Sequence, residues 1–173
     1  MSSAKSAITI RPLRRSEWSA FKDCRLAALK SAPGVFSTSY EDALARSPVA
    51  WRETITGQRH QVFGLFDGAP MIGITGVFGD REYSEAGTAH LVMSFIIPEY
   101  RKRGLSRMLF HARLDWIRIH GKFKRAIAKV RASNEVSQRA CRHFGFVCIG
   151  RTPRTWPDGT TEDELVYELR FLD

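Results

Sequence analysis

The order of apolar and polar positions divides the chain into helices and strands. Over residues 103–120, apolar side chains recur at intervals of three and four and predict a long amphipathic helix. Residues 88–97 are almost continuously apolar, which is typical of a strand buried on both faces. Shorter strands are expected at 7–13, 61–66, 71–78, 125–130, 146–150 and 163–171, and further helices at 16–30, 40–46, 48–57 and 134–144. The pattern predicts a single α/β domain over residues 1–173.

The junction between the long strand and the long helix has the composition of an anion-binding loop. It reads Ile96-Ile97-Pro98-Glu99-Tyr100-Arg101-Lys102-Arg103-Gly104-Leu105-Ser106-Arg107. The first turn of a helix presents unpaired N–H groups and the positive end of the helix dipole, and both favour a phosphate. Gly104 lets a ligand approach the backbone closely. A plain joint with a solvated basic face explains the same residues, so this motif is weak by itself.

The charge balance favours anionic partners without selecting one. The chain carries 27 Lys and Arg against 18 Asp and Glu, a formal net charge of +9. Such a balance suits nucleic acid, a phosphorylated cofactor or an acidic substrate. The basic residues are spread over 101–107, 122–131, 139–142 and 151–154, with no recognised nucleic-acid motif. Their dispersal disfavours nucleic acid as the main partner.

Composition also bears on location and on metals. No apolar run approaches the ~20 residues that span a membrane, and residues 1–7 lack the pattern of a signal peptide. We therefore expect a cytoplasmic protein with no membrane partner. Cys24, Cys141 and Cys148 lack CxxC spacing, so neither a metal site nor a disulfide framework is expected.

A second motif follows the first by about thirty residues. A predicted strand ends near Val130, Asn134 stands at the start of the next predicted helix, and Gly145-Phe146 leads from that helix into another strand. Asn134 taken singly is explained as a helix N-cap. The order and spacing of the two motifs give the pair more weight than either has alone.

Together the two motifs resemble the GNAT superfamily of N-acetyltransferases. The family's pyrophosphate loop, R/Q-x-x-G-x-G/A, is matched by Arg101 to Ser106, with Ser106 at the final small position. Its N-x-x-A-x-x-x-Y-x-x-x-G-F pattern is matched from Asn134 to Phe146, and the order of elements agrees over residues 8–171. The resemblance implies a mixed, mostly antiparallel central sheet of about seven strands flanked by helices. It also implies a V-shaped cofactor cleft between strands four and five.

The resemblance implies acetyl-CoA as the co-substrate. The cofactor-binding residues that it implies are Phe95, Ile96, Ile97, Lys102, Arg103, Gly104, Leu105, Ser106, Arg107 and Asn134. The pantetheine arm is expected along residues 95–97, the pyrophosphate on the N–H groups of residues 102–107, and Asn134 beside the arm. An acceptor amine is expected to attack the thioester directly, with proximity supplying much of the rate. Backbone N–H groups near Ile96 would polarise the acetyl carbonyl.

Two departures from the family leave the proton carriers open. Cys141 stands where the family often has the tyrosine that protonates the CoA thiolate, and the alternative is that it is a small buried helix residue. Residues 129–134 look closest to ribosomal-protein alanine N-acetyltransferases, but Lys129 replaces their glutamate base. His90 is a second candidate catalytic residue, since histidine suits base chemistry near neutral pH, or it is an ordinary strand residue. Simple alternation places His90 and Ser94 on one face of the strand.

The predicted function is that of an acyltransferase, an acetyl-CoA-dependent N-acetyltransferase. The expected acceptor is a primary amine of a small molecule, peptide or protein, and a homodimer is left open as a further partner. The alternative is a non-catalytic acyl-CoA-binding or regulatory module. Residues considered for the acceptor side are Phe36, Tyr40, Trp51, Trp156, Glu82, Tyr83, Glu85 and the cluster Glu162-Asp163-Glu164. Core packing is the favoured explanation for the two tryptophans, and a solvated turn explains the acidic cluster equally well.

Overall fold

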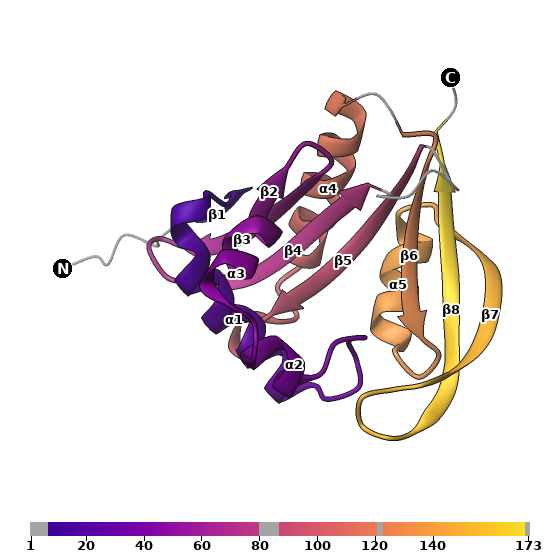
Figure 1. Ribbon diagram of the computed structural model, residues 1–173. Helices are drawn as coiled ribbons and strands as arrows, with labels where there is room; N and C mark the ends of the chain where they lie inside the picture. Colours follow the sequence, from indigo (N-terminus) through magenta and orange to yellow (C-terminus); the bar gives the residue numbers. More distant parts are fainter. Residues whose placement is uncertain (1–6, 80–86, 121–122, 172–173) are drawn as a thin grey trace.

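The computed structural model describes residues 7–79, 87–120 and 123–171, which form one sheet with helices on both faces (Figure 1). The strands are β1 (Ile8–Pro12), β2 (Thr56–Gly57), β3 (His60–Asp67), β4 (Met71–Gly79), β5 (Thr88–Ile96), β6 (Arg125–Arg131), β7 (Val147–Thr155) and β8 (Thr161–Arg170). The helices are α1 (Trp18–Ser31), α2 (Tyr40–Leu44), α3 (Pro48–Ile55), α4 (Ser106–His120) and α5 (Glu135–His143). Short 3₁₀ turns occupy Arg15–Glu17 and Pro98–Tyr100.

The sheet is mixed and mostly antiparallel, as predicted. In the described part of the chain its order is β1-β3-β4-β5-β6-β8-β7, and the two-residue β2 pairs beside this path with β3. Among the described strands, β5 and β6 are the only pair that runs in parallel, because α4 carries the chain back between them. Seven longer strands agree with the expected number, and β2 is a short addition.

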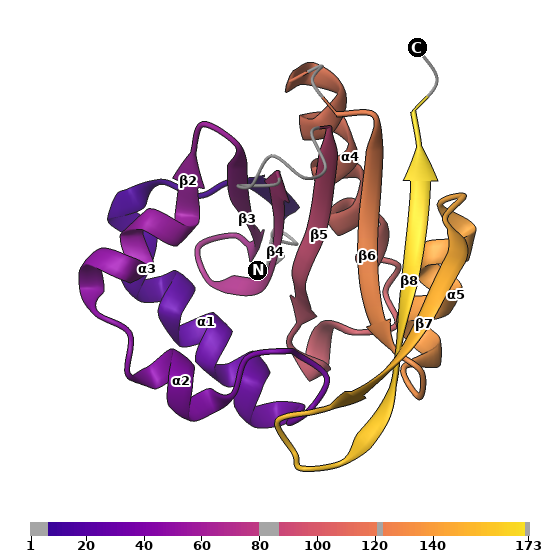
Figure 2. The ribbon, with the colours of Figure 1, turned by 45° about the vertical axis from the view of Figure 1, so that its right-hand side comes forward.

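Two apolar clusters bind the helices to opposite faces of the sheet. On one face, Phe110 and Leu114 of α4 pack with Leu91 of β5 in a buried cluster. On the other, Phe21 of α1 and Trp51 of α3 pack against the sheet in a second cluster. Figures 1 and 2 show the resulting layers, with α1, α2 and α3 on one side and α4 and α5 on the other. The sheet thus has a core on each face.

The parallel strands β5 and β6 separate halfway along their length. They pair only from Thr88 to Leu91 on β5, opposite residues 125–128 of β6. Beyond that point β6 pairs only with β8, and Figure 2 shows β5 and β6 diverging toward their C-terminal ends. The β4–β5 register shifts at this position, and Met93 has a φ of 58°. A β-bulge thus lies at the point where the fourth and fifth long strands part, in the predicted V-shaped arrangement.

The last hairpin is longer than the sequence pattern predicts. Strands expected at 146–150 and 163–171 extend as β7 and β8 up to a turn over residues 156–160. Glu162, Asp163 and Glu164 consequently lie within β8 and not in a turn. Their partners are arginines on β6 and β7: Arg131, Arg151 and Arg154 respectively. Ion pairs take the place of apolar alternation here, which is why periodicity did not reveal the full strands.

Candidate active site

The loop before α4 forms a concave array of backbone N–H groups. Lys102 and Gly104 have positive φ angles of 61° and 73°, and Arg103 between them does not. Such alternation turns successive N–H groups toward one point and makes an anion-binding nest. Within the described residues, the N–H groups of residues 102–106 donate to no backbone or side-chain acceptor. The Arg107 N–H, expected to join them, instead donates to the Gly104 carbonyl at 3.2 Å. The loop therefore offers a set of unused donors to an anion.

Side-chain hydrogen bonds hold this loop in place and leave its surface open. Tyr100 Oη donates to Asp67 Oδ2 at 2.6 Å, which ties the 3₁₀ turn to the end of β3. Arg103 Nη2 donates to the Glu99 carbonyl at 2.9 Å. A Cβ atom placed on Gly104 would meet nothing within 4 Å. Free space therefore lies beside the N–H array, as a phosphate group requires.

The backbone of β5 next to this loop is only partly free. Ile97 N–H donates to the Ile72 carbonyl at 2.9 Å, toward β4, so strand alternation turns the Ile96 amide and carbonyl toward the opening. Arg101 Nε donates to the Ile96 carbonyl at 2.8 Å. The Phe95 side chain is buried in the cluster under α1. Of the backbone groups expected to contact the pantetheine arm, the Ile96 carbonyl thus already accepts a hydrogen bond from within the chain.

Asn134 and Cys141 both belong to α5. Asn134 Oδ1 accepts from the Ser137 N–H at 3.1 Å, so it caps the helix as its residue type favours. Cys141 is 2% exposed within the core cluster under α4. Burial raises the pKa of its thiol to about 11, against a smaller lowering by the charge of Arg113. The thiol is therefore protonated at neutral pH.

The bulge at Met93 separates His90 from Ser94. The neighbours of His90, Ala89 and Leu91, lie in the cluster under α4, so His90 is on the opposite face, toward α1–α3. Ser94 accepts a hydrogen bond from α4 and is on the α4 face. The expectation that both share a face is wrong, because the extra residue in the bulge reverses the alternation. Only His90 faces the side of the sheet covered by α1.

The sequence pattern does not single out Arg113, which the structure brings to the opening. It lies on the buried side of α4 and is 2% exposed. Its Nη1 donates to Ser94 Oγ at 2.8 Å and its Nε to the Leu109 carbonyl at 3.1 Å. The guanidinium carbon is 4.5 Å from the centre of the Phe110 ring. The available signal was a charge inside an apolar stripe, between Phe110 and Leu114.

Arg131, the last residue of β6, holds the β7–β8 hairpin and the segment after α1 against the end of that strand. Its Nε donates to Glu162 at 2.5 Å and its Nη1 to Asp158 at 2.7 Å, both carboxylates of the β7–β8 hairpin. Nη1 also donates to the Gly34 carbonyl at 3.0 Å, in the segment after α1. Nη2 donates to Thr160 Oγ1 at 2.5 Å. One side chain thereby joins three segments that are distant in the sequence.

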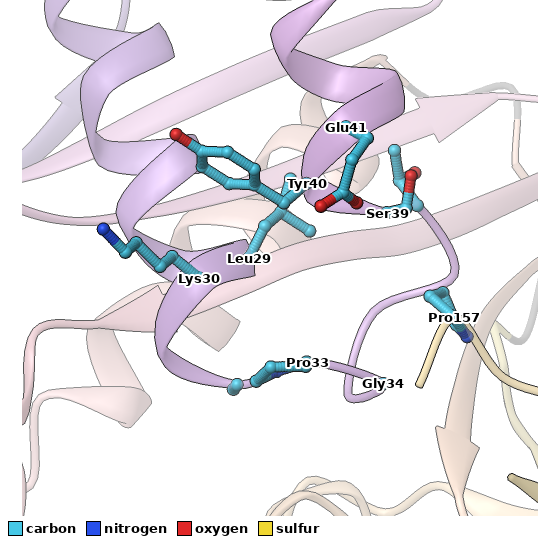
Figure 3. A pocket seen from close by; sticks show the side chains of 10 residues that line it. Leu29, Lys30, Pro33, Gly34, Ser39, Tyr40, Glu41 and Pro157 are labelled. Atoms are coloured by element: carbon cyan, nitrogen blue, oxygen red, sulfur yellow. The ribbon is translucent and has the colours of Figure 1, made fainter. Parts of the chain in front are cut away.

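A surface pocket lies beside this junction. It has a volume of about 380 Å³ and is formed by the end of α1, the start of α2 and Pro157 of the β7–β8 hairpin. Figure 3 shows the Tyr40 ring, the Glu41 carboxylate and the Ser39 hydroxyl around it. Gly34 also lines the pocket and is the residue held by Arg131. Phe36 instead packs under the Arg25 guanidinium.

Other expected residues contribute less. Lys129 Nζ lies 3.7 Å from Glu164 Oε1, so the residue expected in place of the glutamate of ribosomal-protein alanine N-acetyltransferases is in an ion pair. Glu82, Tyr83 and Glu85 lie outside the described residues. Among the described residues, no cluster of His, Cys, Asp or Glu could hold a metal ion, and no helix is long and apolar enough to cross a membrane.

Comparisons with known proteins identify the family of the chain. The model of the Acetyltransferase (GNAT) family matches residues 18–146, so the chain belongs to that family of acyltransferases, whose co-substrate is acetyl-CoA. A GNAT-family acetyltransferase from Streptococcus pneumoniae is similar in structure, with a TM-score of 0.79 and 15% identity over 95% of this chain and 100% of that one. No protein of curated function matches the sequence.

Two further structures share the fold. The putative acetyltransferase yncA from Salmonella typhimurium, solved with its cofactor acetyl-CoA, has a TM-score of 0.77 and 19% identity over 97% of this chain and 96% of that one. The ribosomal-protein-S18-alanine N-acetyltransferase from Escherichia coli has a TM-score of 0.68 and 20% identity over 95% and 94%. At these identities the similarity shows the fold alone.

Proposed function

We propose that this chain transfers an acetyl group from acetyl-CoA to a primary amine of a small molecule, peptide or protein by direct attack. The observation that carries the proposal is the loop before α4, whose unused N–H groups adjoin a strand that has parted from its neighbour. An anion site and an open strand edge at one place suit a long cofactor with a phosphorylated end. The cytoplasm is the location we propose.

Each part of the cleft has a distinct task in this proposal. The N–H groups of residues 102–106 would hold the pyrophosphate, and the free side of Ile96 would bind the arm and polarise the acetyl carbonyl. Leu105 anchors the start of α4 by packing into a small cluster with Leu109. Arg107 adds positive charge beside the loop. Bound acetyl-CoA supplies a thioester carbonyl that a neutral amine can attack.

The pocket beside Arg131 is our candidate for the acceptor side. It lies where the β7–β8 hairpin meets the α1–α2 connection, next to the C-terminal end of β6. The Tyr40 ring and the Glu41 carboxylate suit an amine with an apolar body (Figure 3). His90, on the same side of the sheet as α1, stays the candidate for removing a proton from the amine, and Cys141 stays a candidate acid.

Calorimetry with acetyl-CoA, followed by a thiol-release assay over a panel of amines, peptides and proteins, tests the proposal. We expect a single binding event per chain and release of CoA thiol in the presence of an acceptor amine. Absence of acetyl-CoA binding would contradict it.

A non-catalytic acyl-CoA-binding module is the second candidate. The ion pair of Lys129 and the burial of Cys141 favour it, because the two positions that carry base and acid in relatives hold neither an exposed carboxylate nor a tyrosine. Tight binding of acetyl-CoA with no thiol release on any acceptor would support the module. Sedimentation analysis of the same sample would decide whether the chain forms the homodimer left open by its sequence.

A further inference from the structure

Arg113 is a buried cation without a counter-ion among the described residues. It is 2% exposed, and in the described part of the chain it forms no ion pair with a carboxylate and its Nη2 has no hydrogen-bond partner. Burial lowers its pKa to about 9, which leaves the guanidinium charged at neutral pH. Burying a charged group with an unused hydrogen-bond donor lowers the stability of the fold unless an anion pairs with the charge and accepts from the donor. The structure therefore contains a place prepared for a negative group.

The guanidinium lies between β5 and α5, near the point where β5 and β6 separate. On one side it donates to Ser94 of β5, which lies beyond the last residue paired with β6 and is exposed. On the other side its charge acts on Cys141 of α5. The hydrogen bond to Ser94 thus places the buried guanidinium beside the stretch of β5 that has parted from β6. Two other unpartnered donors, Arg25 Nη1 and Trp51 Nε1, belong to helices on the opposite face of the sheet.

We propose that Arg113 binds and stabilises the thiolate of CoA as the acetyl group leaves it. This inference rests on the proposed function and names the residue that serves its leaving group. The amine nitrogen forms a bond to the acetyl carbon, the carbon–sulfur bond breaks, and its electron pair goes to sulfur. The amine loses its proton to its base, for which His90 is our candidate, and the thiolate accepts a proton from solvent after it leaves Arg113.

This arrangement removes the need for an acid at residue 141. A cation close to a developing anion stabilises the transition state by electrostatics, with no proton transfer in that step. Cys141 is short and buried, and the charge of Arg113 on α4 acts on it. The alternative is that Arg113 only joins α4 to β5 through Ser94.

The pKa of the CoA thiol, bound and free, separates these two roles. We would measure the affinities of CoA and of desulfo-CoA, which lacks the sulfur, by calorimetry from pH 6 to pH 8.5. A cysteine thiol has a pKa of about 8.5, which we take as the reference for the free CoA thiol, and a nearby cation lowers it by about one unit or more. A one-unit shift makes CoA bind about fivefold more tightly at pH 8.5 than at pH 6, relative to desulfo-CoA. Desulfo-CoA corrects for every other titrating group.

The variants are Arg113→Met, Arg113→Lys and a control, Arg118→Met. Met keeps much of the length without the charge, so Arg113→Met should abolish the pH-dependent preference for CoA, while Arg113→Lys should keep part of it. Arg118 lies on the exposed side of α4 and pairs with Asp115, so its removal should change nothing. Circular dichroism would verify that each variant is folded.

The outcomes distinguish the two levels of the proposal. Wild-type protein that binds both ligands with no pH-dependent preference for CoA would overturn the role of Arg113 and leave the acetyltransferase proposal standing. A pH-dependent preference for CoA in Arg113→Met equal to that of the wild type would also overturn the role of Arg113 and leave the acetyltransferase proposal standing. Failure of the wild type to bind either ligand would contradict the proposed function itself.

Discussion

Two arginines at the cleft, Arg131 and Arg113, differ in how completely their donors are used. Arg131 meets two carboxylates, a hydroxyl and a backbone carbonyl, and joins β6 to the β7–β8 hairpin and to Gly34. Arg113 is more deeply buried and meets one hydroxyl and one carbonyl, with Nη2 unused. A saturated arginine serves the fold, whereas an unsaturated buried one is kept at a cost to stability. The difference points to a ligand for Arg113.

The largest expected effect is on turnover, from Arg113→Met. Removing one preorganised stabiliser of a developing anion typically costs ~10²-fold in kcat. Thermal stability should stay the same or rise by roughly 2–4 °C, because an apolar side chain replaces an unpaired buried charge. Steady-state kinetics with the best acceptor and a melting curve would measure both. A kcat within threefold of wild type would contradict the assignment of a ligand to Arg113.

The backbone offers the same contrast between a donor with an acceptor and a donor without one. Gly104→Ala tests it, with Gly159→Ala as the matched control. Both glycines have positive φ, 73° and 80°, and a Cβ on either meets nothing within 4 Å. The Gly159 N–H donates to the Trp156 carbonyl, whereas the Gly104 N–H has no acceptor among the described residues. We expect each variant to lose about 1 kcal/mol of stability from backbone strain.

Affinity for CoA should separate the two glycine variants. Gly104→Ala should weaken CoA binding about tenfold, the equivalent of 1.4 kcal/mol, because the methyl group enters the phosphate site. Gly159→Ala should leave that affinity unchanged. Calorimetry with CoA measures the difference, and equal affinities would show that Gly104 has only a structural role.

Arg131→Met should lower stability and leave turnover nearly unchanged, which is the opposite of the result expected for Arg113→Met. It leaves Asp158 and Glu162 without their arginine and frees the segment after α1, so we expect the melting temperature to fall by roughly 5 °C. The kcat at low temperature and saturating substrate should change less than threefold. Arg151→Met, which removes one exposed ion pair with Asp163, is the matched control and should melt as wild type does. Loss of activity without loss of stability would contradict this assignment.

The sequence predicts most of the fold and the anion loop, because these depend on local composition. The apolar run of β5, the stripe of α4 and Gly104 between them are visible in the printed order of residues. Positive φ at Lys102 and the bulge at Met93 are not, since each is a non-glycine residue held by its surroundings. The bulge in turn decides which face Ser94 occupies, and so the partner of Arg113 depends on tertiary structure.

The smallest expected effect is a loss of stability in acid that depends on Arg131. Hydrogen bonds from Thr160 and Arg131 lower the pKa of Asp158 from 3.8 to about 2, and Arg131 likewise lowers the pKa of Glu162. Because the folded pKa values are the lower ones, this stabilisation is complete only above about pH 5 and is lost as the pH falls toward about 2. Melting curves at pH 5, 4 and 3 should therefore fall more steeply for wild type than for Arg131→Met. Arg113 has no carboxylate among its contacts in the described chain, so Arg113→Met should keep the wild-type slope, and a flattened slope in that variant would show that the two arginines share a network.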